Sequence, residues 1–141
     1  MAKFLFGSLL LFIICLFGCS KNDEYNEEEA LRRGDIVYQN KVKNIKRLNE
    51  FIANFSNNKP DTIRITVFTK EGDPIFQDLK FDEEAIQYNY DNSNDQYAGK
   101  GKGIKFDVCK SIAKKENDQN IFEYYLSNCT KNHEYFLIPV E

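Results

Sequence analysis

The chain has 141 residues, with 19 basic and 22 acidic side chains, one histidine, four cysteines and no tryptophan. A chain of this length is expected to form one domain. Its net charge of −3 does not favour the dense basic surface that nucleic-acid binding requires, so no nucleic-acid partner is expected. The single histidine, His133, excludes a metal site built from several histidines. We expect no metal and no cofactor.

The N-terminal residues have the pattern of a bacterial export signal. A positively charged start at Lys3 is followed by an almost entirely apolar run over residues 4–17. This run has 14 residues, whereas a transmembrane helix needs roughly 20. Residues 16–19, Leu-Phe-Gly-Cys, resemble a bacterial lipobox. We therefore expect residues 1–18 to be a lipoprotein signal peptide and Cys19 to be the lipidated residue. An ordinary secretory signal and an uncleaved N-terminal anchor are the alternatives.

The expected lipid would attach the protein to a membrane. Diacylglycerol on Cys19 supplies two acyl chains, and two chains give stable anchoring where one is marginal. The expected location is thus the outer face of the cell membrane, outside the cytoplasm. Residues 19–29 are acidic and contain one large apolar residue, Tyr25. Because such a segment buries little surface, we expect a flexible tether there and a single domain over residues 30–141.

The clearest expected helix covers residues 44–55. Its apolar residues recur at spacings of three, four and seven and form one stripe, which is typical of a core helix. A helix that binds a partner or a membrane would show the same stripe. Asn44 suits the N-cap, and the polar run before Pro60 suits the end of the helix. Earlier in the chain, residues 30–33 indicate only the last turn of a short helix that stops at Gly34.

After Pro60 the pattern changes to an alternation of apolar and polar residues, which indicates strands. The expected strands lie within residues 62–69, 75–81, 86–90, 104–108, 122–126 and 135–138. One helix followed by a run of strands predicts the α+β fold class. In this architecture one main amphipathic helix packs on a mainly antiparallel sheet of about five to six strands.

Cys109 and Cys129 are the cysteines that remain beside Cys19 once the signal peptide is removed. Outside the cytoplasm an isolated pair is expected to form a structural disulfide. If residues 117–120 are a hairpin loop, Cys109 faces Asn128, one residue from its partner. A bulge or a different loop length would bring the two cysteines opposite each other. No Cys-x-x-Cys spacing favours a redox-active pair.

No catalytic motif is complete in the sequence. His133 could act as a general base with nearby carboxylates such as Glu134 and Asp107, which would make the protein a small hydrolase. The sequence has no Gly-x-Ser-x-Gly motif, and the mature chain is expected to have no free thiol. We therefore assign no catalytic residue and expect no enzymatic activity.

Several segments, spread over about residues 30–138, have a recognisable order and spacing. They are Arg33 to Val37, Asn44 to Phe55, Ile63 to Thr66, Thr69 to Ile75, Tyr90 to Ser93, and the pair Cys109 and Cys129. Together they resemble the domain of unknown function 4362 family, which comprises small lipoproteins of Gram-positive, Bacillus-type bacteria. The resemblance implies a lipoprotein that faces the cell wall, and it carries over no catalytic residue.

These observations favour a non-enzymatic binding or interaction module at the cell envelope. Its partner would be an envelope protein, a peptide or a wall component. Exposed tyrosines serve well at interfaces. The possible interaction surface comprises Tyr88, Tyr90, Asp91, Asp95 and Tyr97. The alternatives are the small envelope hydrolase that uses His133, and a structural or stress-induced envelope protein.

Overall fold

The computed structural model describes residues 25–140. Within this range the chain forms two α-helices, one short 3-10 helix and eight strands. They are α1 (Glu27–Arg33), β1 (Ile36–Tyr38), β2 (Val42–Lys43), α2 (Ile45–Ser56), β3 (Asp61–Phe68), β4 (Pro74–Phe81), β5 (Ile86–Asp91), η1 (Gly99–Gly101), β6 (Ile104–Glu116), β7 (Phe122–Cys129) and β8 (Tyr135–Val140). The expected signal peptide and Cys19 lie outside the described residues. Neither α-helix in the described range has the length and apolar character needed to span a membrane.

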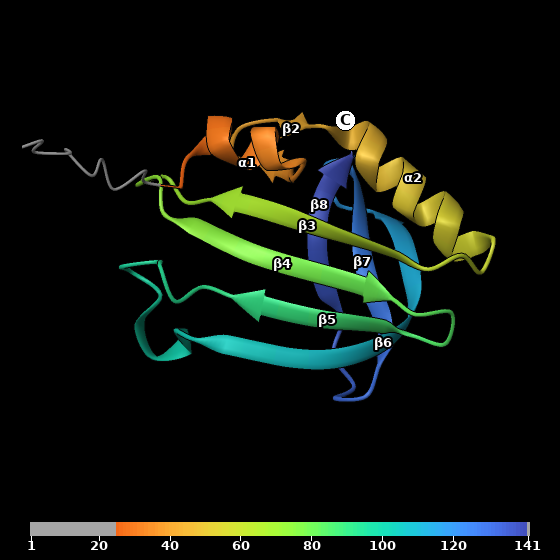
Figure 1. The fold of residues 1–141 in the computed structure, drawn as a ribbon. Coiled ribbons are helices and arrows are strands. Elements are labelled where there is room, and N and C mark those ends of the chain that lie inside the picture. The colour runs from red at the N-terminus through yellow and green to blue at the C-terminus, as the bar shows by residue number, and fades with distance from the viewer. Residues whose placement is uncertain (1–24, 141) are drawn as a thin grey trace, which may run out of the picture.

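All eight strands of the described range belong to one sheet, in the order β2-β1-β3-β4-β5-β6-β7-β8. Neighbouring strands are antiparallel except β1 and β3, which run parallel with Ile36 opposite Ile65. The sheet curls until β2 approaches β8 and thus forms a nearly closed barrel (Figure 1). Of the two end strands, β2 has only two residues and β8 contains Pro139 near its end.

The expected fold class is therefore wrong. The protein is mostly β, with two short helices on an eight-stranded barrel-like sheet, rather than one helix on a sheet of five to six strands. The six strands expected from alternation are present, but β1 and β2 were missed. Segments of three and two residues are too short to display an alternation, and the parallel pairing of β1 with β3 is a long-range contact that no local pattern encodes.

Helix α2 confirms the helix expected over residues 44–55, and its apolar stripe packs on the inner face of the sheet. Leu48 and Phe51 are fully buried in the main core. The Phe55 ring meets the Phe81 ring of β4 edge-on, with centroids 4.9 Å apart. The apolar stripe of α2 thus packs in the protein core, which is one of the two roles that the sequence pattern allowed.

Asn44 precedes α2 but does not cap it as expected. It adopts the left-handed conformation (φ 58°), and its side-chain amide instead donates to the carbonyl oxygens of Gly34 and Asp35, each at 3.1 Å. The buried Asp35 side chain in turn accepts hydrogen bonds from Tyr25 and from Thr66 of β3. These contacts join the start of the described chain to β1, β3 and α2.

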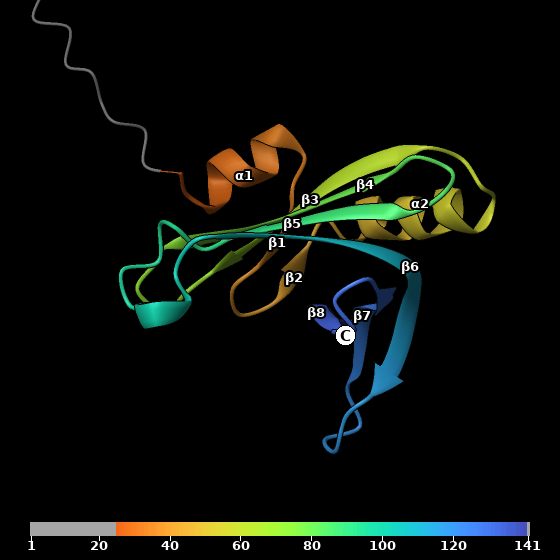
Figure 2. The same ribbon diagram turned by 90° about the horizontal axis from the view of Figure 1, so that it is seen from below.

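Helix α1 lies on the outer face of the sheet, on the side of β3–β5 opposite β7 and β8 (Figure 2). It forms a small second core in which Ala30 packs with Val37 and Phe68. Just before the helix, the Tyr25 ring contacts the Phe76 ring of β4 edge-on, with centroids 4.9 Å apart. The sheet is thus covered by one helix on each face.

The start of α1 corrects the expected boundary between tether and domain. Residues 27–29, which we assigned to the tether, form the first turn of the helix. The Asn26 side chain caps this turn by accepting a hydrogen bond from the Glu29 backbone N–H at 3.0 Å. The acidic side chains of the first turn also complement the helix dipole. Gly34, with φ 90°, ends the helix as expected.

Strand β6 reverses the face that its side chains present. Asp107 and Cys109 point into the barrel, but beyond Lys110 it is Ile112 that packs against the same core. On the neighbouring strand Asn128 adopts a left-handed conformation (φ 53°), while the register between β6 and β7 stays the same on both sides of it. The strand bends sharply along its length (Figure 2), so one long strand contributes to two walls of the barrel.

A disulfide bond joins Cys109 of β6 to Cys129 of β7, which confirms the expected pairing. The two residues lie directly opposite each other in the β6–β7 ladder. This register requires a hairpin loop over residues 117–121, because Glu116 pairs with Phe122. The loop is thus one residue longer than residues 117–120, and the different loop length is what aligns the cysteines.

Candidate functional site

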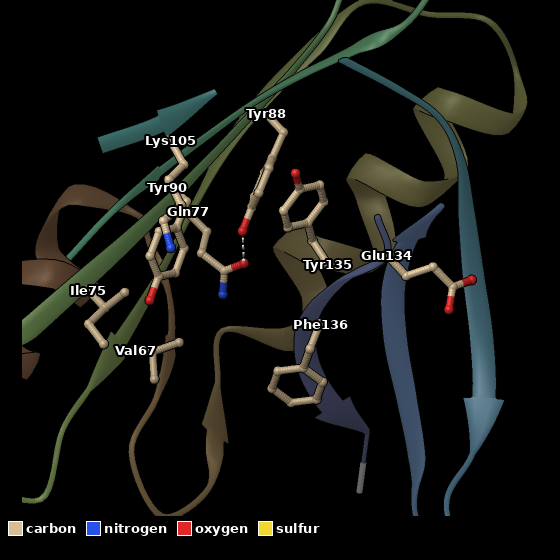
Figure 3. A pocket seen from close by; sticks show the side chains of 9 residues that line it. All are labelled: Val67, Ile75, Gln77, Tyr88, Tyr90, Lys105, Glu134, Tyr135 and Phe136. Carbon is tan, nitrogen blue, oxygen red and sulfur yellow. Dashed lines mark hydrogen bonds between the residues drawn. The ribbon is translucent and has the colours of Figure 1, made fainter. Parts of the chain in front are cut away.

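A cavity of about 350 Å³, open to solvent on one side, lies on the inner face of the sheet, near the end where β4 and β6 begin and β5 ends (Figure 3). Strands β3, β4, β5, β6 and β8 supply its walls. The side chains that line it are mostly apolar or aromatic and include a few polar groups. They are Val67, Ile75, Gln77, Tyr88, Tyr90, Lys105, Glu134, Tyr135 and Phe136.

The alternation of the strands explains which side chains reach the cavity. On β4, Ile75 and Gln77 share the inward face with the buried Leu79. On β5, Tyr88 and Tyr90 share it with the buried Ile86. Because alternate side chains of a strand share one face, these four residues lie on the same inner face as the core residues and line the cavity.

The inner end of the cavity is formed by a hydrogen-bonded pair. The Tyr88 hydroxyl donates to Gln77 Oε1 at 2.8 Å, and Gln77 Nε2 donates to the Leu137 carbonyl oxygen at 3.2 Å (Figure 3). Tyr88 and Gln77 are both buried, and burial raises the pKa of the Tyr88 hydroxyl above its ordinary value. The pair therefore offers a neutral, fixed polar surface within an apolar wall.

A second polar network holds Tyr135 beside this pair. The Tyr135 hydroxyl donates to Asp107 Oδ2 at 2.7 Å, and its ring centroid lies 4.7 Å from that of Tyr88. Burial, and then the hydrogen bond to Asp107, raise the pKa of Tyr135 to about 12. Burial alone would raise the pKa of Asp107, but hydrogen bonds from Thr130, Tyr135 and two backbone N–H groups lower it to about 2. Asp107 is thus a buried carboxylate that fixes the position of Tyr135.

Two charged side chains stand at the mouth of the cavity. The Lys105 ammonium lies over the Tyr90 ring, 5.5 Å from its centroid. Glu134 Oε2 forms an ion pair with Lys115 Nζ at 2.5 Å. Among residues 25–140, Lys105 takes part in no ion pair with a carboxylate. The unbalanced charge in the lining of the cavity is therefore positive.

The five residues expected to form an interaction surface do not form one. Tyr88 is only 2% exposed and points into the barrel, whereas Tyr97 is 75% exposed. Tyr90 is half-buried in the cavity wall. Asp91 and Asp95 accept hydrogen bonds from nearby backbone N–H groups of their own loop. Because the sheet closes into a barrel, one side of the expected patch faces inward.

His133 lies exposed in the connection between β7 and β8. Its ring is 6.4 Å from that of Tyr135, and no hydrogen bond joins it to Glu134 or Asp107 among the described residues. The two carboxylates are engaged elsewhere, Glu134 by Lys115 and Asp107 by hydroxyl groups. Over residues 25–140 no group of three or more histidine, cysteine or acidic side chains is placed to hold a metal ion.

Gln77 and Lys105 were missed as site residues. The sequence did indicate Gln77, because it lies between Ile75 and Leu79 among the alternate positions of β4 whose side chains face the interior. A polar residue at such a position has to find a partner inside the protein. Lys105 gave a weaker signal, because β6 starts with exposed residues on both faces.

The fold and the cavity define a class of small, disulfide-bonded protein in which a nearly closed, barrel-like sheet carries an open cavity on its inner face. The sequence profile of the family described as a domain of unknown function (DUF4362) matches residues 33–124. The chain belongs to this family, which confirms the resemblance seen in the sequence. Six of the nine lining residues, Val67 to Lys105, lie within the match, and the three from Glu134 to Phe136 lie beyond it. No curated protein and no solved structure matches the chain.

Proposed function

We propose that the protein is a lipid-anchored, extracytoplasmic binding protein that holds a small molecule of the cell envelope in its barrel cavity. The observation that carries the proposal is the cavity itself. Its volume of about 350 Å³ falls in the range of small-molecule sites. Such sites combine apolar walls with a few placed polar groups, as Gln77, Tyr88 and Lys105 are placed here.

The polar groups of the cavity support binding rather than catalysis. Tyr88 and Gln77 hydrogen-bond each other, and Asp107 holds Tyr135. These contacts fix the shape of the cavity and use the side chains as structural partners. A rigid site of this kind loses little conformational entropy when a ligand enters.

The location rests on two features of the chain. The sequence Leu-Phe-Gly-Cys at residues 16–19 supports lipidation of Cys19, and the disulfide between Cys109 and Cys129 is of the kind that persists outside the cytoplasm. Mass spectrometry of the N-terminal peptide from membranes tests the anchor. We expect a diacylglyceryl group on Cys19 and release of a Cys19→Ala variant from the membrane fraction. An unmodified Cys19 in the membrane-bound protein would contradict the anchor.

Binding in the cavity can be measured with a neutral aromatic probe, N-phenyl-1-naphthylamine, whose fluorescence rises in apolar surroundings. The mature chain with Cys19→Ser lacks the lipid and keeps every described residue. We expect saturable binding of one probe per chain. The Ile75→Trp variant fills the cavity and should weaken binding at least about tenfold, the loss of about 1.4 kcal/mol.

The matched control is Ile104→Trp, which adds the same side chain at a 68% exposed position of β6. It should bind the probe as the unchanged chain does. Circular dichroism and urea midpoints establish that both variants are folded. Equal binding by the folded Ile75→Trp variant, or no saturable binding by the unchanged chain, would refute the proposed function.

A further inference from the structure

We propose that the ligand of the cavity is an organic acid, with a flat apolar body that lies between the aromatic walls and one anionic group that pairs with Lys105. This inference rests on the proposed function and adds the chemical class of the ligand. It follows from three features: the shape of the walls, the charge at the mouth, and the positions of the neighbouring carboxylates.

The walls favour a flat apolar body. Tyr90 and Phe136 contribute aromatic rings, and Val67 and Ile75 contribute branched aliphatic groups (Figure 3). Aromatic side chains pack well against planar groups in offset or edge-on arrangements. Phe136 is 41% exposed although it is a large apolar residue. A ligand that covers it would remove this apolar surface from water.

The charge at the mouth favours an anion. Of the two charged residues in the lining, Glu134 is already paired with Lys115. In Figure 3 the Glu134 side chain also extends away from Tyr88 and Gln77. Lys105 has no carboxylate partner within residues 25–140 and lies over Tyr90 inside the lining. Its ammonium group is thus free to pair with an anionic group of a ligand.

Two other carboxylates near the cavity are held by their own partners. Asp107 accepts hydrogen bonds from the Thr130 and Tyr135 hydroxyls and is not itself part of the lining. Burial raises the pKa of Tyr90, and the nearby charge of Asp95 raises it further. Asp95 Oδ1 accepts a hydrogen bond from the Tyr97 backbone N–H at 2.8 Å. The lysine remains the charged group of the lining that a ligand can neutralise.

A cationic ligand fits this arrangement less well. Aromatic rings can bind a cation over their faces. Here the Lys105 ammonium already lies over the Tyr90 face, 5.5 Å from the ring centroid. A second cation would be repelled by it, whereas an anion would be attracted. We therefore assign the acid, and a cationic probe becomes one outcome of the test.

The experiment compares two probes that share one aromatic skeleton. 1-Anilinonaphthalene-8-sulfonate carries a sulfonate, and N-phenyl-1-naphthylamine is the same skeleton without it. Both are titrated into the mature chain with Cys19→Ser. The unchanged chain should bind the sulfonate more tightly than the neutral probe. Lys105→Met should weaken sulfonate binding about five- to tenfold and leave the neutral probe unaffected, because only the charge-assisted contact is lost.

Two further variants separate charge from shape. Lys105→Arg keeps the charge and should bind the sulfonate almost as well as the unchanged chain. Lys80→Met removes an exposed lysine from the outward face of β4 and should change neither probe. Ile75→Trp should abolish the tight binding of both probes, which locates them in the cavity rather than on an exposed apolar surface.

Each alternative outcome has one meaning. If the neutral probe binds in the cavity but Lys105→Met does not weaken sulfonate binding, the acid assignment is wrong and the proposed function stands. If Lys105→Met weakens both probes equally, the lysine shapes the cavity and the assignment also fails. Tighter binding of the cationic dye thioflavin T than of the sulfonate would overturn it as well. If neither naphthalene probe binds, both proposals fall.

Discussion

Reduction of the disulfide between Cys109 and Cys129 should lower the stability of the barrel by a predictable amount. The bridge joins residues separated by 20 positions. In the chain-entropy argument, a closed loop of this length stabilises the folded state by about 3 kcal/mol at 25 °C. The total free energy of unfolding of such a domain is about 5–15 kcal/mol, so the bridge supplies a substantial part of it.

Urea unfolding of residues 19–141 with Cys19→Ser, with and without dithiothreitol, measures this contribution. With a slope of about 1.5 kcal/mol per M, the loss of about 3 kcal/mol lowers the midpoint by about 2 M. The double variant Cys109→Ala, Cys129→Ala is the control, and its midpoint should not respond to dithiothreitol. If mass spectrometry shows complete reduction and the midpoint does not move, the loop-entropy reasoning is refuted.

Two further predictions concern the polar networks of the cavity. Tyr88→Phe removes the donor of the buried Gln77 Oε1 and should cost about 1–3 kcal/mol in urea unfolding, whereas Tyr97→Phe at the exposed loop should cost almost nothing. Because the pKa of Asp107 is lowered to about 2, its stabilising contribution is complete above its ordinary pKa of 3.8 and is lost as the pH falls through about 2. Between pH 4 and pH 2.5 the urea midpoint should therefore fall further in the unchanged chain than in the Asp107→Asn variant. An equal fall in the two proteins would contradict this assignment.

Local periodicity was enough to locate most of the secondary structure. The stripe from Ile45 to Phe55 predicted α2, and alternation predicted β3 to β8, because both patterns are set by side chains that share one core. The start of α1 was missed because its acidic residues 27–29 were interpreted as a solvated tether. The Asn26 cap was the signal for the helix, and it lies one residue before that acidic run.

The closure of the sheet could not be predicted in the same way. It depends on the pairing of β1 with β3 and on the bend of β6, and neither produces a periodic pattern (Figure 2). Closure also determines the site. Tyr88 follows Ile86 on one face of β5, so the sequence allowed it to be either a core or a surface residue. Only the three-dimensional arrangement places its hydroxyl beside Gln77.

The short β2 and the proline in β8 have a consequence for the tendency of the protein to self-associate. An unprotected sheet edge can recruit a strand from another molecule and start aggregation. Here one edge strand, β2, has only two residues, and the other edge strand, β8, lacks a backbone N–H donor at Pro139. Gln77 also occupies the Leu137 carbonyl oxygen from inside. Both edges of the sheet are therefore poor templates for self-association, even at high protein concentration.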